Sequence, residues 1–405
     1  MSIAVRKVAM VVALASAVPS CGLHEIGDVD PTVLKEGVWG GPIEENGGAG
    51  VIEQICYMTA LDYQKGYDWR ADRARESVRC SLVVYADGRP IMKVPVGEEY
   101  ESCADPDMHR VIGGHLYTDY STSHETVIKR DGVQMFRYPG REVICGMAVC
   151  EECIYTLGQN REGSGFTYRK NGEVVISREN GSVMGGLAHE GDSLYFAFSE
   201  RIKSSTGEID RYYAVRNGKV KQVAVRDDVM KVWGVMFSSR SETYLASLVG
   251  VAEPVLFKDG MMVTLPLPST DVLLSASMSG SPERVVVEMM CVSEGRVYSA
   301  IWQEDDFPVS FPKGYLVSSI CCQDDGVCCT VNPSDASSSG IIYRCGEILD
   351  MPEGYSCVGG SAMCMVNGIL HVGLSSHDGS ETLVWKDGET EPLKVNGYVA
   401  SISAL

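Results

Sequence analysis

No apolar run in this sequence is long enough to cross a lipid bilayer as a helix. The longest run, Val8–Val18, contains 11 residues, whereas a membrane-spanning helix needs about 20. A bundle of transmembrane helices is therefore excluded. The chain has the composition of a folded protein, because 45% of its 405 residues are hydrophobic and 22% are charged.

Positive charge is also scarce. The chain has 35 lysines and arginines against 54 aspartates and glutamates, which gives a formal net charge of −19. A surface of this sign repels phosphate backbones and anionic lipid headgroups. We therefore expect no nucleic acid among the partners, and contact with a membrane only through an anchor.

Signatures of metal and redox chemistry are missing as well. The seven histidines form no HxxxH, HxH or HExxH pattern, and the CxxC pair Cys150–Cys153 has no second copy. Residues Ser376–Ser380 differ from the Asp-box of propeller sialidases, because Asp378 and Gly379 are adjacent. We predict no metal and no cofactor. Cys150 and Cys153 are expected to flank a hairpin, as thiols or as a local disulfide.

The N-terminus has the features of an export signal. Two positive charges precede the apolar run, and Val18-Pro19-Ser20-Cys21 follows it, which resembles a bacterial lipobox. We predict a lipoprotein signal peptide over residues 1–20 and lipidation of Cys21. Ordinary secretion with an unmodified Cys21 is the alternative.

The residues that follow are predicted to form a lipid-anchored tether. Residues 21–50 are rich in glycine and acidic residues and show little periodicity. Gly22 stands directly after the cysteine, and Gram-negative sorting rules that this resembles favour the outer membrane when no Asp is there. The sequence leaves open whether the protein faces the periplasm or the cell surface.

A short signature recurs along the rest of the chain. It consists of an aromatic or aliphatic residue, a basic residue, Asn or Asp, and then Gly. The copy in Tyr85–Gly88 has Ala in place of the basic residue, and the copy in Tyr343–Gly346 has Cys before its glycine. Its glycines are Gly88, Gly132, Gly172, Gly218, Gly260, Gly346 and Gly388. They are spaced by 44, 40, 46, 42, 86 and 42 residues. The interval of 86 is two periods and contains a degenerate copy at Ile301–Asp305, which makes eight copies.

Each period predicts four short strands. Asp-Gly and Asn-Gly supply the positive φ angles of a type I′ turn, so each signature marks a two-residue hairpin. A strand of alternating pattern precedes each hairpin, and a strand of small residues, such as Cys145–Ala148, precedes that one. We expect the small residues to lie where strands converge. The pattern predicts an all-β fold, a β-propeller of four-stranded blades over residues 51–405.

The number of blades depends on two segments. We predict eight blades, one of which contains the degenerate copy around Trp302. Seven is the alternative, if that copy is a large insertion. The first copy has no small-residue strand before it, whereas Gly397–Ala404 at the C-terminus has that composition. We therefore predict that the C-terminal strand completes the first blade and so closes the ring.

Taken together, the lipobox, the acidic glycine-rich tether and the aromatic-Lys-Asn-Gly blades resemble the β-propeller lipoproteins of Bacteroidetes. The resemblance covers nearly the whole chain. It implies the propeller fold and the envelope location, and it transfers no catalytic residue, because its repeated motif is a structural turn.

Fourteen cysteines remain besides Cys21. Several fall inside predicted strands, among them Cys56, Cys145, Cys291 and Cys364, and buried cysteine behaves as a small hydrophobic residue. The pattern favours buried thiols. A minority of disulfides stays open for an exported chain.

One connection has the composition of a binding loop. The segment 63–76 is the longest connection between second and third strands, and it is rich in aromatic residues and arginines. Aromatic faces stack on sugars, and arginine recognises carboxylates. We predict ligand contacts from Tyr63, Tyr67, Trp69, Arg70 and Arg73. A surface helix over residues 69–78 is the alternative.

The function predicted from these features is recognition without catalysis. A glycan or an envelope protein would bind to the loop-rich face of a propeller anchored at the outer membrane. The alternative is a polysaccharide-processing enzyme, which would need two carboxylates about 5 to 10 Å apart. The sequence offers Glu200, Asp210, Asp271 and Asp324 for that role and brings no two of them together. Further long connections are expected at 98–107, 200–210 and 332–340.

Overall fold

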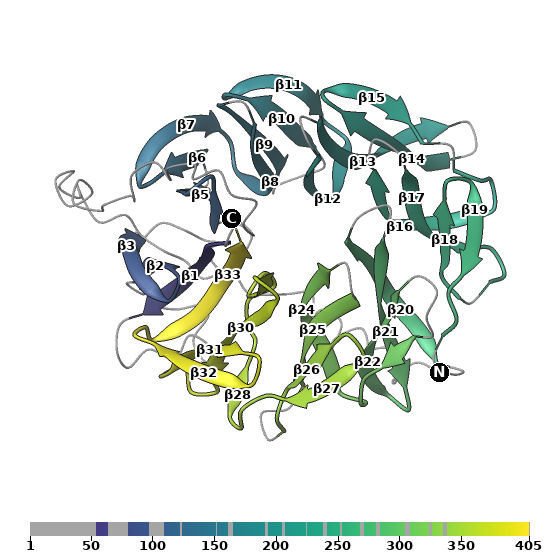
Figure 1. Cartoon of the computed structure of the whole chain (residues 1–405). Coiled ribbons are helices and arrows are strands. Elements are labelled where there is room, and N and C mark those ends of the chain that lie inside the picture. The colour runs from purple at the N-terminus through teal and green to yellow at the C-terminus, as the bar shows by residue number, and fades with distance from the viewer. Residues whose placement is uncertain are drawn as a thin grey trace, which may run out of the picture. The chain divides into compact units, whose positions relative to one another are not determined.

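The computed structural model describes residues 54–63, 80–96, 109–121, 124–150, 152–160, 165–190, 193–204, 207–223, 225–237, 241–251, 253–267, 271–280, 284–303, 308–323, 326–334 and 338–404. The predicted signal peptide, Cys21 and the tether lie outside these residues. Regular structure in the described part consists of strands only, β1 to β33 (Figure 1). None of it is a helix that could span a membrane.

The strands form eight sheets of four main strands, and the fold is an eight-bladed β-propeller. Five successive blades, from β8 to β27, belong to one compact unit of the chain. The blades formed by β28–β32 and by β1–β3 with β33 belong to a second unit. The degenerate copy around Trp302 is a blade of its own, because β20–β23 form a separate sheet.

The five blades of the first unit have the same order, in which each strand pairs with the next along the chain. The first is β8 (Glu142–Cys150), β9 (Cys153–Asn160), β10 (Phe166–Lys170) and β11 (Glu173–Arg178). The second is β12 (Gly181–Glu190), β13 (Ser193–Ser204), β14 (Gly207–Arg216) and β15 (Lys219–Gln222). The third is β16 (Val229–Phe237), β17 (Glu242–Leu248), β18 (Val255–Lys258) and β19 (Met261–Thr264). The fourth is β20 (Val272–Gly280), β21 (Val285–Ser293), β22 (Arg296–Gln303) and β23 (Val309–Ser310). The fifth is β24 (Tyr315–Gln323), β25 (Gly326–Pro333), β26 (Ile341–Arg344) and β27 (Glu347–Asp350).

The C-terminal strand completes the first blade, as the composition of Gly397–Ala404 predicts. This blade is β33 (Gly397–Ala404), β1 (Cys56–Tyr63), β2 (Cys80–Ala86) and β3 (Arg89–Val96). Strand β33 runs antiparallel to β1, with Cys56 opposite Ala404 and Asp62 opposite Gly397. In Figure 1 the last and first strands of the chain lie side by side. The first blade has no strand of its own before β1, and β33 therefore takes the place of that first strand.

Two blades complete the set. One is β4 (His109–Ile112), β5 (His115–Ser121), β6 (Glu125–Arg130) and β7 (Val133–Pro139). The other is β28 (Tyr355–Ser356), β29 (Met363–Val366), β30 (Ile369–Ser376), β31 (Thr382–Lys386) and β32 (Glu389–Leu393). Both β28 and β29 pair with β30, so the first strand of this blade is interrupted. The small residues of Val358–Ala362, expected in one strand, lie in the interruption, where Ser361 forms a parallel bridge with Ser401 of β33.

The predicted hairpins are confirmed at the seven signature glycines, each of which lies where the third and fourth strands of a blade join, here called the turn end. The corresponding connection of the blade β20–β23, residues 304–307, lies outside the described residues. The residue before each signature glycine has a positive φ between 44° and 51°, and the glycine has one between 76° and 101°. This is the backbone of a type I′ turn. The opposite end, where the second and third strands join and the fourth leads on to the next blade, is here called the loop end.

The first strands have small residues because they approach one another closely. A Cβ on Gly146 of β8 would lie 2.5 Å from the backbone nitrogen of Leu187 in β12. The same strands are bulged, since the register shifts at Ile144/Gly146 in β8 and at Met184/Ala188 in β12. The expectation that small side chains stand where strands converge is confirmed at this pair.

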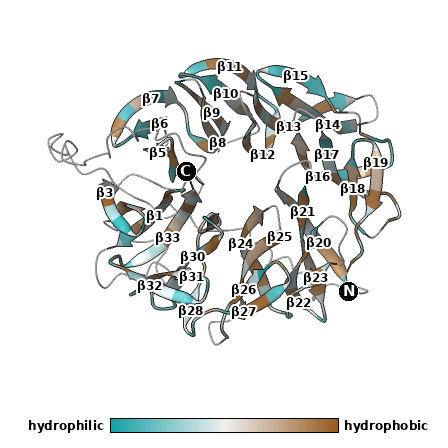
Figure 2. Cartoon of the chain, viewed as in Figure 1, coloured by the Kyte–Doolittle hydropathy of each residue, from teal (hydrophilic) through white to brown (hydrophobic). Residues whose placement is uncertain are grey.

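The core lies between neighbouring sheets. One cluster joins Leu245 and Leu256 of one blade to Val287 and Met289 of the next, and all four are almost fully buried. Fourth strands are exposed by contrast, as in β15 and β19, whose residues are all solvent-accessible. Both hydrophobic and hydrophilic residues lie in such strands, as β7 shows in Figure 2, and β19 has three exposed hydrophobic residues, Met261, Met262 and Val263. Burial between sheets therefore supplies the hydrophobic stabilisation of each blade.

Candidate functional site

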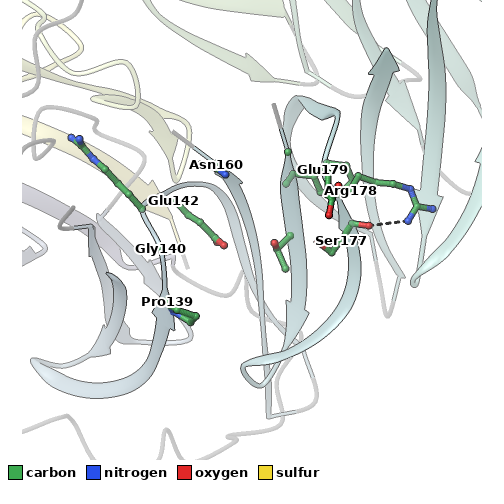
Figure 3. A pocket seen from close by; sticks show the side chains of 11 residues that line it. Pro139, Gly140, Glu142, Asn160, Ser177, Arg178 and Glu179 are labelled. Carbon is green, nitrogen blue, oxygen red and sulfur yellow. Dashed lines mark hydrogen bonds between the residues drawn. The ribbon is translucent and has the colours of Figure 1, made fainter. Parts of the chain in front are cut away.

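A pocket of about 230 Å³ opens at the loop end of the blade β8–β11. Strands β8, β10 and the last residues of β7, β9 and β11 surround it (Figure 3). Lining residues also come from three places where strands end or begin at the loop end: Gly140 and Arg141 between β7 and β8, Gly165 before β10, and Glu179 after β11. The pocket is therefore on the side of the blade where the sequence predicts ligand binding.

The floor of the pocket contains a buried ion pair. Arg169 of β10 donates to both oxygens of Glu142 in β8, at 2.6 and 2.7 Å. The two side chains are 7% and 11% exposed, and the guanidinium also lies 4.0 Å from the centre of the Tyr138 ring. A bidentate pair of this kind fixes both partners in one geometry. Arg169 thus balances the negative charge of Glu142 and holds its carboxylate in one orientation at the pocket.

Two small residues place Glu142 there. A Cβ on Gly158 of β9 would lie 2.2 Å from Glu142 Oε2, so this position has room only for glycine beneath the carboxylate. Thr126 is fully buried, donates its hydroxyl to Gly140 O at 3.0 Å and accepts from the backbone N–H of Glu142 at 2.9 Å. These two hydrogen bonds therefore hold the β7–β8 connection in place beside the pocket, at Gly140 and at Glu142.

The side-chain amide of Gln159 connects the chain segments on the other side of the pocket. It donates to Gly165 O at 2.7 Å and accepts from the backbone N–H of Val183 in β12 at 2.7 Å. The backbone N–H of Asn160 also donates to Gly165 O, at 2.8 Å. These bonds join the last residues of β9 to Gly165, which precedes β10, and to Val183 in β12.

The remaining wall combines an aromatic ring with polar groups. Phe166 is 2% exposed, and its ring lies 4.7 Å from that of Phe198. The guanidinium of Arg178 reaches away from Glu142 and donates to its neighbour's carbonyl, Ser177 O, at 2.9 Å (Figure 3). Amide and hydroxyl groups therefore border the space in front of Glu142, and the guanidinium nitrogens of Arg178 do not.

Chemically, the pocket offers hydrogen bonds to a polar group. Asn160, Thr167 and Ser177 supply amide and hydroxyl side chains, and all three are accessible to solvent. Glu142 supplies carboxylate oxygens whose charge Arg169 balances. Such a set suits a hydroxyl-rich group that donates and accepts at once. The volume suits one small group rather than an extended ligand.

The sequence reasoning places the predicted ligand contacts elsewhere. Tyr63 is the last residue of β1 and is 3% exposed, with its ring centre 6.4 Å from that of Tyr398. It is a core residue, so the connection begins after it and Tyr63 presents no stacking surface. Tyr67, Trp69, Arg70 and Arg73 lie outside the described residues.

The acids considered for glycosidase chemistry have separate roles. Asp210 accepts from Arg201 at 2.9 and 3.3 Å, and both lie in the extended hairpin of β13 and β14. The segment 200–210 is therefore mostly strand and not a loop. Asp271 precedes β20 and accepts from the hydroxyl of Tyr298 in β22 of the same blade, at 2.5 Å. Asp324 lies outside the described residues.

The remaining motifs also have structural positions. Cys150 and Cys153 face each other across the β8–β9 hairpin, and no disulfide joins any of the twelve cysteines whose side chains the structure describes. Cys56 and Cys291 are buried thiols, as predicted, whereas Cys145 and Cys364 are half-buried. Asp378 accepts from Ser376 and Ser380, and these hydrogen bonds lower its pKa to about 2. The segment 376–380 is thus a polar turn between β30 and β31.

Sequence reasoning missed the pocket at β8–β11. Its floor joins Glu142 to Arg169, which are 27 residues apart, and no motif spacing links them. Gly158 is the one local signal, because a glycine inside a strand marks a close approach. That signal does not say which group approaches.

Comparison with known proteins identifies no family. No family model and no curated protein matches the sequence. The chain is similar in structure to the β-propeller domain of the Trilobed protease from Pyrococcus furiosus, with a TM-score of 0.45, 9% identity, and coverage of 73% of this chain and 91% of that one.

Two further solved structures are similar to a comparable degree. For acylaminoacyl peptidase from Pyrococcus horikoshii the TM-score is 0.44 and the identity 10%, over 74% of this chain and 53% of that one. For TolB from Acinetobacter baumannii the TM-score is 0.36 and the identity 10%, over 86% and 82%. These likenesses are too distant to carry an argument about activity. The assignment of the β-propeller fold rests on the eight four-stranded sheets of the chain itself.

Proposed function

We propose that this protein is a recognition module of the cell envelope that binds a glycan through the loop ends of its blades. The observation that carries the proposal is the polar pocket at the loop end of β8–β11, lined by Glu142, whose carboxylate is paired with Arg169. Sugar hydroxyls donate and accept hydrogen bonds, and the pocket offers both kinds of partner. Both oxygens of Glu142 are already engaged by Arg169, which favours binding over acid–base catalysis.

The connection after β1 supports a second contact for the same ligand class. Tyr67 and Trp69 would stack on sugar rings, and Arg70 and Arg73 would recognise uronic or sialic carboxylates. Anchoring through a lipid on Cys21, at the outer membrane, would keep the module at the envelope and leave the propeller in the aqueous phase.

The experiment that tests recognition is binding of the mature protein to an array of microbial and host polysaccharides. We expect binding to a defined glycan that falls at least tenfold in the double variant Asn160→Ala/Ser177→Ala. The matched control is Glu173→Ala, an exposed polar residue at the turn end of the same blade, which should bind like the wild type.

The alternatives give different outcomes in the same assay. Release of saccharide from a bound glycan would favour the polysaccharide-processing enzyme. A blank array would overturn glycan recognition and leave an envelope protein as the partner to seek. If Trp69→Ala weakens binding and the pocket variant does not, the connection after β1 is the site and the pocket is not.

The lipid anchor has its own test. Full-length protein expressed in a Gram-negative host should incorporate labelled fatty acid and fractionate with the outer membrane. Cys21→Ser should abolish both. Labelling that persists in Cys21→Ser would contradict the anchor without affecting the glycan proposal.

A further inference from the structure

The turn end of the blade β24–β27 differs from those of its sister blades. In six blades the first turn residue is Asp or Asn, and its Oδ1 accepts from a backbone N–H near the start of the second strand at 2.8 to 3.1 Å. These residues are Asp87, Asp131, Asn171, Asn217, Asp259 and Asp387. The same residue also donates its own N–H to the carbonyl of that strand residue. This pair of bonds is the repeated closure of the turn.

Cys345 occupies this position in the blade β24–β27. It keeps the left-handed backbone, with φ of 46°, and its N–H donates to Val327 O at 3.0 Å. Its thiol replaces the side-chain oxygen that accepts in the other blades. A left-handed cysteine with an exposed side chain therefore stands where six sister turns have a hydrogen-bond acceptor.

The neighbouring strand position has changed as well. The residue that follows the paired strand residue is aromatic in five blades: Tyr57, Tyr117, Tyr155, Tyr195 and His371. In β25 this residue is Cys328, which is fully buried. The two thiols face each other, with 3.9 Å between Cys328 Sγ and Cys345 Sγ. Two positions that contact each other thus both carry cysteine in one blade.

A third change makes room for the pair. Gly326 precedes Val327, and a Cβ there would lie 2.9 Å from Cys345 Sγ. The corresponding residues His115 and Ser241 in other blades have side chains that contact the turn aspartate, at 2.6 and 2.9 Å. With glycine at this place, the Cys345 thiol lies over the backbone and next to Cys328.

From this arrangement we propose that Cys328 and Cys345 are a redox-active dithiol, a modification site that closes to a disulfide on reaction with a low-molecular-weight disulfide. The exposed Cys345 thiolate attacks one sulfur of the small disulfide and releases one small thiol. Cys328, as thiolate, then attacks Cys345 Sγ and displaces the second small thiol. The two protein thiols are oxidised, the small disulfide is reduced to two thiols, and the protons pass to those thiols.

The surroundings assign the order of the two steps. Burial, followed by the neighbouring Cys345, raises the pKa of the Cys328 thiol to about 12. A buried thiol of raised pKa reacts slowly with external reagents. Cys345 is exposed and meets the reagent first, and Cys328 resolves the mixed disulfide. A disulfide requires the sulfurs to approach to about 2.05 Å, which rotation of the exposed Cys345 side chain can supply.

The test is mild oxidation of the folded protein with oxidised glutathione, followed by non-reducing peptide mapping. Trypsin cleavage after Arg344 separates the two cysteines onto different peptides. We expect a cross-linked pair carrying Cys328 and Cys345 that disappears on reduction. In Cys328→Ala, Cys345 should remain glutathionylated, because the resolving thiol is gone.

Cys345→Asn is the matched variant, since it restores the residue found in sister turns and preserves folding. It should form neither the cross-link nor the mixed disulfide at this turn. A wild-type protein in which Cys345 stays glutathionylated or unreacted would overturn the proposal. So would a cross-link of Cys328 to Cys321, its partner across β24 and β25.

Discussion

The turn ends and the loop ends of the blades differ in how far they repeat. At the turn end, six blades close with the same Asp or Asn geometry, and one blade replaces it with Cys345. At the loop end, one blade has a pocket over an ion pair, and the next extends β13 and β14 into a long hairpin. Repetition therefore marks what every blade needs to fold, and variation marks where one blade can acquire its own chemistry.

The largest effect is expected from breaking the ion pair beneath the pocket. Arg169→Met leaves Glu142 buried without its partner, which should lower the free energy of unfolding by about 3–5 kcal/mol, measured by urea denaturation. The control Arg201→Met removes an exposed pair with Asp210, with side chains 65% and 37% exposed, and should leave the free energy of unfolding almost unchanged, because solvent screens such pairs. Equal losses in the two variants would contradict a special role for the loop end of β8–β11.

A smaller effect is expected at Gly158, which makes room for the same carboxylate. In Gly158→Ala the new Cβ meets Glu142 Oε2, and Arg169 prevents the carboxylate from turning away. We expect a loss of about 1–3 kcal/mol in the free energy of unfolding. The loss should shrink in the Arg169→Met background, since the carboxylate can then move, and a double-mutant cycle measures that coupling. Strict additivity would show that the two sites are independent.

The repeated closure at the turn end can be separated into two components at Asn171. Asn171→Gly keeps the positive φ and removes the acceptor for the backbone N–H of Ile154, so the free energy of unfolding should fall by about 0.5–1.5 kcal/mol. Asn171→Ala also places alanine in the left-handed conformation, which should lower the free energy of unfolding by about a further 1 kcal/mol. Thermal or urea unfolding measures both. If alanine is tolerated better than glycine, the turn is not held by its backbone conformation.

The smallest effect is a dependence on pH at His371, also at a turn end. Burial lowers the pKa of this imidazole from its ordinary value of 6.5. The unfolded chain therefore binds a proton more readily, and the stabilisation present above about pH 6.5 is lost as the pH falls below it. His371→Phe, which matches the aromatic residues of sister blades, should flatten the difference between pH 5 and pH 8. Urea midpoints that change with pH equally in both proteins would contradict this.

Much of the fold could be read from the chain because it depends on local chemistry. Asp-Gly and Asn-Gly set the hairpins, their period set the number of blades, and the composition of Gly397–Ala404 identified the strand that completes the first blade. The interruption between β28 and β29 could not be read in the same way. Small residues predict a crowded strand, but only the contact with β33 shows that the chain leaves the ladder there.

Most residues of the candidate sites could not be predicted from the sequence. Tyr63 looks like a loop aromatic beside Tyr67 and Trp69, yet β1 extends through it and buries its ring. A strand end is decided by the length of the neighbouring strand that it pairs with, which local composition does not reveal.

By itself, the sequence determined the period, the turn geometry, the choice between seven and eight blades and the expectation of a lipid anchor, and the sheet β20–β23 decided for eight. These follow from backbone preferences and from residues within one repeat. Only the tertiary structure brought Glu142 to Arg169, and Cys328 to Cys345. The physical reason is that side chains on different strands meet according to register and bulges, and a shift of one residue turns a side chain to the other face of its sheet.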